Sequence, residues 1–116
     1  MIGALVVDDD AALRMLCRVN LEIEGFAVRE AATVAEAEAA VAAERPDVVL
    51  LDVHLGGDQT DELLSRLRSA GIPVAVVTGS VDIEDYRDAA DAVIAKPFLP
   101  QDLVETARRL AKVSGE

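Results

Sequence analysis

Residue types that mark particular protein classes are scarce in this 116-residue sequence. Its single cysteine, Cys17, excludes an internal disulfide and a cysteine-based metal cluster. Aromatic residues make up only 3% of the chain, so its core has to be aliphatic and rich in alanine. No apolar run approaches the roughly 20 residues of a membrane span, and no basic segment of the kind that opens a signal peptide begins the chain. These absences predict a cytoplasmic protein in a reducing compartment.

Basic residues are also few, because 11 Lys and Arg stand against 22 Asp and Glu, for a formal net charge of −11. Nucleic acids and anionic membranes attract basic surfaces, so we expect neither as a direct partner. Apolar residues, in contrast, make up 52% of the sequence, which is enough for a packed core. We therefore expect one domain over residues 1–116, with no output domain.

Short apolar runs alternate with longer stretches of helical periodicity. The runs that predict strands lie at 4–7, 26–30, 48–51, 74–77 and 92–95. A helix is expected after each strand, with a short one within 82–90 and the last at about 101–112. Continuous aliphatic strands are typical of a parallel sheet that helices cover on both faces. The sequence thus predicts an α/β protein.

Local signals mark the ends of the first two helices. Asp10 is placed to cap the first helix and Gly25 to end it, while Thr33 followed by Glu36 predicts a capping box for the second. Four apolar residues form a stripe on one face of the first helix: Leu13, Leu16, Cys17 and Leu21. Of these, Cys17 is expected to be a small core residue.

Polar residues stand where the predicted strands end. Asp8 and Asp9 follow the first strand, Asp52 ends the third, Thr78 the fourth and Lys96 the fifth. In a doubly wound sheet these carboxyl ends lie along one edge, where ligands bind. Converging carboxylates repel one another and so require a cation, and an all-oxygen shell suits Mg²⁺. A lysine and a hydroxyl opposite the metal can hold an anion, so the pattern predicts a phosphoryl-binding site.

With these motifs in place, the sequence resembles the receiver domain of bacterial two-component response regulators. Four segments carry the resemblance: residues 5–10, 49–52, 76–79 and 95–98. Their order and their position at strand ends are more specific than any one motif, and the resemblance covers essentially the whole chain. It implies a flavodoxin-like, doubly wound sheet of five parallel strands in the order 2-1-3-4-5, with five helices.

The resemblance also implies which residues carry the chemistry. Asp52 would be the phosphoacceptor and would become 4-aspartylphosphate. A Mg²⁺ or Mn²⁺ ion would bind Asp9 and Asp52 directly, Asp8 through water, and the backbone carbonyl of His54. We expect the His54 side chain itself to face solvent from a loop.

On the phosphoryl side, the resemblance implies that Thr78 and Lys96 contact phosphoryl oxygens and that the peptide bond before Pro97 is cis. Receivers usually carry an aromatic switch residue three positions before the lysine. That position is Val93 here, which has no hydroxyl and little reach, and this argues against the usual aromatic switch.

These departures coincide with a receiver subclass, sometimes called FAT GUY, that is found in stand-alone regulators. Three features are similar to that subclass: the pair Gly56-Gly57, Pro73 before the fourth strand, and the pair Thr78-Gly79. Its aromatic residues are replaced here by Val74, Val76 and Ser80. The stretch between Thr78 and Lys96 is also shorter than usual by about four residues, which is about one helical turn at 3.6 residues per turn, and this predicts a short or mobile fourth helix. The subclass implies ordering of residues 79–90 on phosphorylation.

The resemblance implies a histidine kinase or a histidine phosphotransfer protein as phosphoryl donor, and an output protein that is unknown. The chain would then not be an enzyme for another substrate and would catalyse only its own phosphorylation and dephosphorylation. Other interpretations stay open: a receiver module cut from a hybrid histidine kinase, a pseudo-receiver that only binds, and a phosphohydrolase. The last would use an aspartyl nucleophile on the first strand, where Asp8 and Asp10 form an Asp-x-Asp pair.

Overall fold

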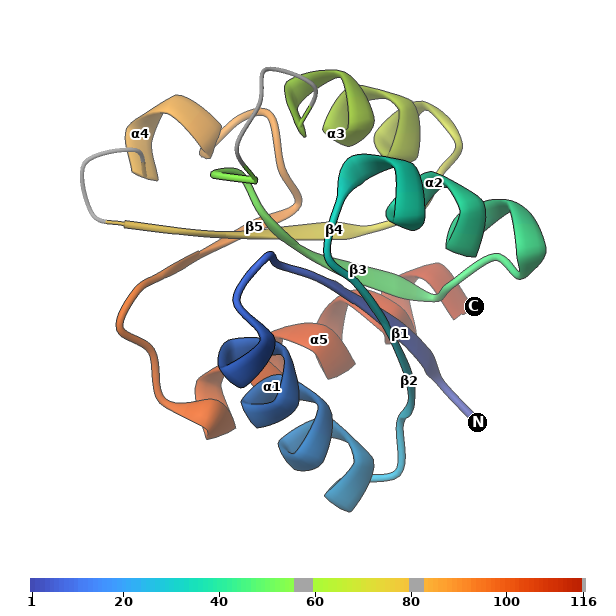
Figure 1. Ribbon diagram of the computed structural model, residues 1–116, viewed down its shortest axis with the longest axis vertical. Coiled ribbons are helices and arrows are strands. Elements are labelled where there is room, and N and C mark those ends of the chain that lie inside the picture. The colour runs from blue at the N-terminus through green and yellow to red at the C-terminus, as the bar shows by residue number, and fades with distance from the viewer. Residues whose placement is uncertain (56–59, 80–82, 116) are drawn as a thin grey trace.

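A computed structural model of the chain describes residues 1–55, 60–79 and 83–115, and its strands and helices alternate throughout (Figure 1). The strands are β1 (Gly3–Val7), β2 (Ala27–Ala31), β3 (Val48–Asp52), β4 (Val74–Thr78) and β5 (Ala92–Ala95). The helices are α1 (Ala11–Ile23), α2 (Val34–Ala43), α3 (Thr60–Ser69), α4 (Ile83–Tyr86) and α5 (Pro100–Gly115). All strand pairs are parallel and their order is β2-β1-β3-β4-β5, which confirms the predicted topology.

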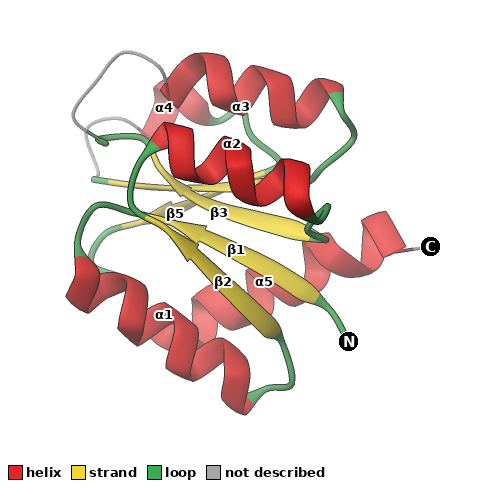
Figure 2. Ribbon diagram, turned by 45° about the vertical axis from the view of Figure 1, so that its right-hand side comes forward, coloured by secondary structure: helices red, strands yellow, loops and turns green. Residues whose placement is uncertain are grey.

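Helices cover both faces of the sheet, with α1 and α5 on one face and α2 and α3 on the other (Figure 2). Because side chains alternate along a strand, each central strand contributes to two separate cores. In β3, Leu50 packs in the α1–α5 core and Leu51 in the α2–α3 core, and both are at most 1% exposed. This two-sided burial is the reason that the strands read as unbroken aliphatic runs.

The predicted helix signals are confirmed. The side chain of Asp10 accepts hydrogen bonds from the backbone N–H groups of Ala12 at 3.0 Å and Leu13 at 3.3 Å. Gly25, which follows the end of α1, has a φ of +94°. This left-handed conformation would strain a residue that has a Cβ atom. At α2, the hydroxyl of Thr33 accepts from the N–H of Glu36 at 3.1 Å, as a capping box requires. The return bond is shifted by one residue, because the Glu36 carboxylate accepts from the N–H of Ala32 at 2.8 Å.

Within the apolar stripe on α1, Cys17 is buried as expected and Leu21 is buried with it, whereas Leu16 is 42% exposed and Leu13 is half-buried. Leu16 precedes Cys17 by one residue, which turns it about 100° around the helix, away from the line that packs on the sheet. The second strand begins one residue later than predicted, because Phe26 belongs to the turn, where its N–H donates to the carbonyl of Leu21.

Among the described residues between β4 and β5, the helix α4 has four residues, which confirms the prediction of a short fourth helix. Some predictions concern residues outside the described ranges, namely those on the pair Gly56-Gly57, on Ser80 and on Asp82. Within the part of the chain that the structure describes, none of the helices combines the length and the apolar composition needed to cross a membrane.

Candidate functional site

Three carboxylates converge at the carboxyl edge of the sheet. Asp52 is the last residue of β3, and Asp8 and Asp9 follow the end of the adjacent strand β1. One carboxylate oxygen of each lies within 4.8 Å of the others. Asp8 and Asp52 are each 4% exposed, whereas Asp9 is exposed. The fold therefore assembles the acidic cluster that the strand-end pattern predicted.

Lys96 is the cation of this cluster among the described residues. Its Nζ lies 3.3 Å from Oδ2 of Asp52 and 3.5 Å from Oδ2 of Asp8. Burial alone would lower the pKa of Lys96, but the negative charges of Asp52 and Asp8 outweigh it and raise the pKa. The pKa of Asp8 is raised, mainly by burial and further by the charge of Asp52. One lysine thus leaves the charge of three carboxylates incompletely balanced.

Backbone N–H groups hold the two buried carboxylates in place. Oδ1 of Asp52 accepts from the N–H of His54 at 2.9 Å, and Oδ1 of Asp8 accepts from the N–H of Asp10 at 2.9 Å. The Asp10 carboxylate is itself used to cap α1. Each buried aspartate therefore has one oxygen bound to the backbone two residues ahead, while its other oxygen faces Lys96.

The ends of β4 and β5 contribute Thr78 and Lys96 to the site. Thr78 is fully buried at the end of β4, and its carbonyl accepts from the N–H of Lys96 at 2.8 Å. The Lys96-Pro97 peptide bond is cis, as predicted. His54 is exposed, but its Nε2 lies 3.5 Å from Oγ1 of Thr78, so the ring reaches across the site. The sequence carried no signal for this contact, because the two residues are 24 positions apart.

Val93 occupies the position at which receivers usually carry an aromatic switch residue. It pairs with Val76 in the sheet and packs, partly buried, against the α2–α3 core together with Tyr86. A branched aliphatic side chain fills this place.

The donor set fits a hard divalent cation. Three carboxylates with oxygens within 4.8 Å offer the all-oxygen environment that Mg²⁺ prefers. Burial is the main cause that raises the pKa of Asp8 and the charge of Asp52 adds to it, and a divalent cation would offset this charge repulsion. Asp9 is exposed, so a bound ion can keep part of its water shell, as Mg²⁺ usually does.

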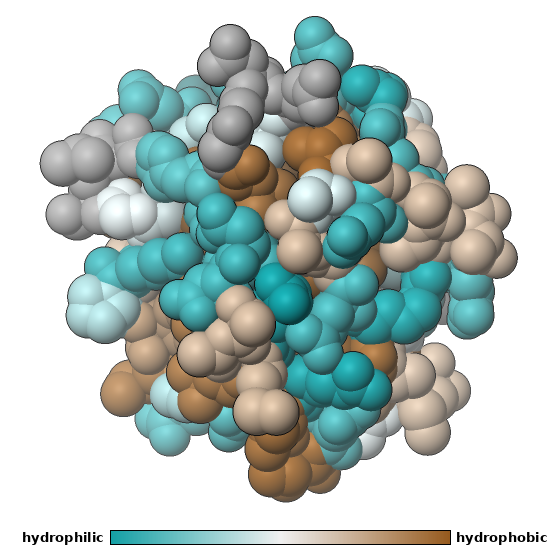
Figure 3. All heavy atoms as spheres, viewed as in Figure 1, coloured by the Kyte–Doolittle hydropathy of each residue, from teal (hydrophilic) through white to brown (hydrophobic). Residues whose placement is uncertain are grey.

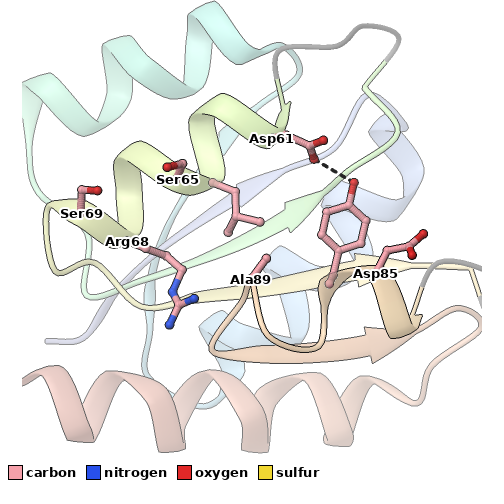
Figure 4. A pocket seen from close by; sticks show the side chains of 8 residues that line it. Asp61, Ser65, Arg68, Ser69, Asp85 and Ala89 are labelled. Carbon is pink, nitrogen blue, oxygen red and sulfur yellow. Dashed lines mark hydrogen bonds between the residues drawn. The ribbon is translucent and has the colours of Figure 1, made fainter.

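A cavity of about 760 Å³ lies between α3 and the residues of and after α4 (Figure 4). Tyr86 and Asp61 lie on its wall, and the hydroxyl of Tyr86 donates to Oδ1 of Asp61 at 2.9 Å. None of the three clustered carboxylates lines it. The candidate site is therefore the carboxyl edge of the sheet, where the three carboxylates and Lys96 lie, and not this cavity.

A doubly wound sheet of order 2-1-3-4-5, with an acidic cluster and a lysine at its carboxyl edge, defines the receiver class of signalling domains. The family model described as "Response regulator receiver domain" matches residues 4–108. The chain belongs to this family. Receiver domains act in two-component systems, where they interact with histidine kinases and bind Mg²⁺ in an acidic pocket.

Two comparisons place the chain among response regulators. It is 34% identical over 119 residues to the phosphate regulon transcriptional regulatory protein PhoB of Pseudomonas aeruginosa, over 96% of this chain and 52% of that protein. It is 38% identical over 109 residues to the DNA-binding response regulator MtrA of Mycobacterium tuberculosis, over 90% of this chain and 48% of that protein. The chain thus spans about half the length of these relatives.

Solved structures agree with this placement. A CheY-like receiver domain protein of Methanospirillum hungatei superimposes with a TM-score of 0.89 at 32% identity, covering 99% of this chain and 97% of that one. The receiver domain of NtrX from Brucella abortus superimposes with a TM-score of 0.86 at 32% identity, covering 94% and 98%. These matches confirm the fold and the family.

Proposed function

We propose that Asp52 is the phosphoacceptor of this receiver and that phosphoryl transfer to it depends on Mg²⁺. The observation that carries the proposal is the cluster of Asp8, Asp9 and Asp52, with oxygens within 4.8 Å, opposite Lys96. Asp52 is the buried carboxylate that also contacts the lysine most closely, at 3.3 Å.

In the proposed reaction, a carboxylate oxygen of Asp52 attacks the phosphorus of a phosphohistidine. The bond from phosphorus to the imidazole nitrogen breaks, and an acyl phosphate forms. Lys96 stays within reach of the product and pairs with a phosphoryl oxygen, and the buried hydroxyl of Thr78 donates to another. The N–H of His54 keeps the carboxylate oriented during attack. The contribution of these groups is therefore positioning and charge stabilisation.

The metal is the second part of the proposal. Asp9 and Asp52 would hold Mg²⁺, or Mn²⁺, directly, the backbone carbonyl of His54 would be a further ligand, and Asp8 would bind it through water. When bound, the ion neutralises charge on the transferring group. The oxygen-only donor set and its repulsion support this assignment.

We propose a histidine kinase or a histidine phosphotransfer protein as the donor, in the cytoplasm, with no direct contact to nucleic acid by this domain. PhoB and MtrA are named as transcriptional or DNA-binding regulators, and the chain matches about half of each. The net charge of −11 supports a protein partner rather than a nucleic acid. We further propose that the domain catalyses only its own phosphorylation and dephosphorylation.

The surface beside the site supports docking of a donor helix. Apolar residues gather over α1 in the lower part of the space-filling view (Figure 3). The exposed apolar residues of α1 are Met15, Leu16, Val19 and Ile23, and half-buried Leu13 lies at its start. Leu99 is also exposed, in the loop of residues 97–99 that follows Lys96. An apolar strip next to a charged site is typical of a helix-docking surface.

For the output, we propose that phosphorylation changes the segment 79–90 rather than the rotamer of Val93. In the described part of this segment, the hydroxyl of Tyr86 on α4 donates to Asp61 on α3, and Arg68 on α3 donates to the carbonyl of Asp88, which follows α4, at 3.1 Å. Backbone amide exchange with and without a phosphoryl mimic tests this. Unchanged exchange rates in α4 would contradict the proposal.

A phosphohydrolase with a strand-one nucleophile is less well supported. Such an enzyme would use Asp8 as nucleophile with Asp10 as a partner acid. In the structure, Asp10 caps α1 through Ala12 and Leu13 and donates its own N–H to Asp8. Its carboxylate is therefore committed to the helix terminus.

The deciding experiment is labelling with a small-molecule phosphodonor. We would compare wild type, Asp52→Asn and Asp8→Asn, with Mg²⁺ and with chelator, and score the alkali lability of the adduct. Alkali-labile labelling that needs Mg²⁺ and is lost in Asp52→Asn is the expected result. Labelling that survives in Asp52→Asn but is lost in Asp8→Asn would move the nucleophile to the first strand.

The donor is tested separately, because some receivers accept phosphate only from a protein. Phosphotransfer from an autophosphorylated histidine kinase supplies that arm. No labelling from either donor would contradict the phosphoacceptor role and favour a pseudo-receiver that only binds.

A further inference from the structure

Arg14 of α1 reaches back to the loop that carries the acidic cluster. Its Nη1 donates to the backbone carbonyl of Asp8 at 2.7 Å, and its Nε donates to Oε1 of Glu30 on β2 at 3.0 Å. The Arg14 side chain is 18% exposed, so it is largely shielded from solvent. One guanidinium therefore joins α1, β2 and the end of β1.

A contact to the Asp8 carbonyl can affect the orientation of the acidic cluster. It belongs to the peptide group between Asp8 and Asp9, so the orientation of this peptide sets where both carboxylates point. The other sides of Asp8 are already bound: its N–H donates to the carbonyl of Ala31 at 3.0 Å, and its carboxylate accepts from Asp10. The carbonyl lies one residue beyond the end of β1, and Arg14 supplies its donor.

We propose that Arg14 is a positioning residue for the metal site, which fixes the Asp8–Asp9 peptide so that both side chains present oxygens to the cation. This inference rests on the proposed Mg²⁺ site. Outer contacts that orient metal ligands commonly affect metal affinity by 10-fold to 100-fold.

Charge and positioning make opposite predictions for Arg14. A guanidinium close to the cluster repels a divalent cation, so its loss should tighten metal binding if charge alone matters. If Arg14 acts by orienting the peptide, its loss should weaken metal binding. The sign of the change therefore separates the two explanations.

Arg18 offers a matched control on the same helix. Its Nη1 donates to Oε2 of the same Glu30 at 2.9 Å and its Nε donates to Glu22 at 3.1 Å, but it has no hydrogen bond to Asp8. Hydrogen bonds from Arg18 and Arg14 lower the pKa of Glu30, so both arginines face a charged carboxylate. Arg14→Gln and Arg18→Gln thus remove the same charge and the same type of partner from Glu30, but only the first removes the contact to the Asp8 carbonyl.

The experiment measures Mn²⁺ binding to the full chain, from the electron paramagnetic resonance signal of the free ion. We expect about a 10-fold weaker affinity for Arg14→Gln, a change of less than about 2-fold for Arg18→Gln, and partial recovery for Arg14→Lys, which keeps a donor. In labelling, the Mg²⁺ concentration for half-maximal rate should rise in Arg14→Gln while the rate at saturating Mg²⁺ changes little. Circular dichroism without metal verifies that each variant is folded.

Unchanged or tighter Mn²⁺ binding by folded Arg14→Gln would overturn the inference, as would equal weakening in Arg18→Gln. If Arg14→Gln does not fold, Arg14→Lys decides the question, because it keeps the positive charge: binding weaker than wild type by less than about 10-fold supports the inference, and binding equal to or tighter than that of wild type overturns it. Wild type that binds no Mn²⁺, or binds it equally well as Asp9→Asn, would instead remove the metal site itself and this inference with it.

Discussion

Replacing Asp8 by asparagine should stabilise the metal-free protein and weaken its response to Mg²⁺. The amide keeps an oxygen to accept the N–H of Asp10, and it removes one of three carboxylates whose oxygens lie within 4.8 Å. The buried position of Asp8, 4% exposed, makes this charge costly without a cation.

The magnitude follows from the distances. At an effective dielectric constant near 20, two charges 4.8 Å apart repel by about 3.5 kcal/mol, so Asp9 and Asp52 together oppose the Asp8 charge by about 7 kcal/mol. Lys96, 3.5 Å away, attracts it by about 5 kcal/mol on the same scale. Because Asp9 is exposed and Lys96 is only half-buried, screening brings these opposing charge terms close to cancellation. The burial of Asp8, which is the main reason that its pKa is raised, then leaves a gain of about 1–2 kcal/mol for a neutral side chain.

Urea unfolding monitored by circular dichroism measures this gain in chelator and in Mg²⁺. In chelator, Asp8→Asn should raise the free energy of unfolding by about 1–2 kcal/mol, or Tm by about 4–8 °C. Mg²⁺ at 100 times its Kd should stabilise wild type by about 2.7 kcal/mol and the variant by less, so the order of stability reverses. Glu105→Gln removes the same charge from an exposed position on α5 and should change neither value.

The pH dependence has a definite sign. Because the pKa of Asp8 in the folded protein is raised above its ordinary value of 3.8, its protonation favours the folded state. Its contribution to stability is full below pH 3.8 and is lost as the pH rises through the raised folded value. The advantage of Asp8→Asn should therefore shrink as the pH falls towards 3.8. A less stable but cooperatively folding Asp8→Asn in chelator would show that attraction to Lys96 dominates, and would refute the reasoning.

Three further predictions concern single residues. Burial raises the pKa of Cys17 to about 11, so at pH 8 the alkylation of its thiol should be at least about 100-fold slower in the folded protein than in urea. The stability that the buried thiol contributes should be lost as the pH rises from about 9 to about 11. Equal alkylation rates in the folded protein and in urea would contradict this. The buried hydroxyl of Thr60 donates to the carbonyl of Val53 at 3.0 Å, so Thr60→Val should cost about 1–3 kcal/mol in urea unfolding and Thr60→Ser less, whereas equal losses would exclude the bond as the cause. Gly25→Ala places a Cβ at a φ of +94° and should cost about 1–2 kcal/mol by the same assay, an unchanged midpoint being the contrary result.

The strands, the helix caps and the strand-end residues of the site were predictable because each is marked by a local sequence pattern. The alternation of aliphatic runs with helical periodicity predicted the five strands, and caps such as Asp10 act within three residues of themselves. Asp52, Thr78 and Lys96 each stand at a strand end, and in a parallel sheet all such ends share one edge. Knowing the element order was therefore enough to bring these residues together.

The burial of individual residues on the apolar face of α1 was less predictable. Leu16 and Cys17 are both apolar neighbours, but only the packing of α1 on the sheet and on α5 decides that Cys17 is buried and Leu16 is exposed. The Phe26 boundary likewise depends on a turn closed by the carbonyl of Leu21. Neither angle nor turn is encoded in the hydropathy of single residues.

The sequence by itself determined the fold class, the strand order through the family resemblance, and the acidic, hydroxyl and lysine residues at the sheet edge. Tertiary structure alone decided that Lys96 contacts two aspartates at once, that the ring of His54 reaches Thr78, and that Arg14 holds the carbonyl of Asp8. The physical reason is distance along the chain and direction in space. Strand ends and caps follow from local periodicity, whereas these contacts depend on how side chains from separate elements are aimed once the layers have packed.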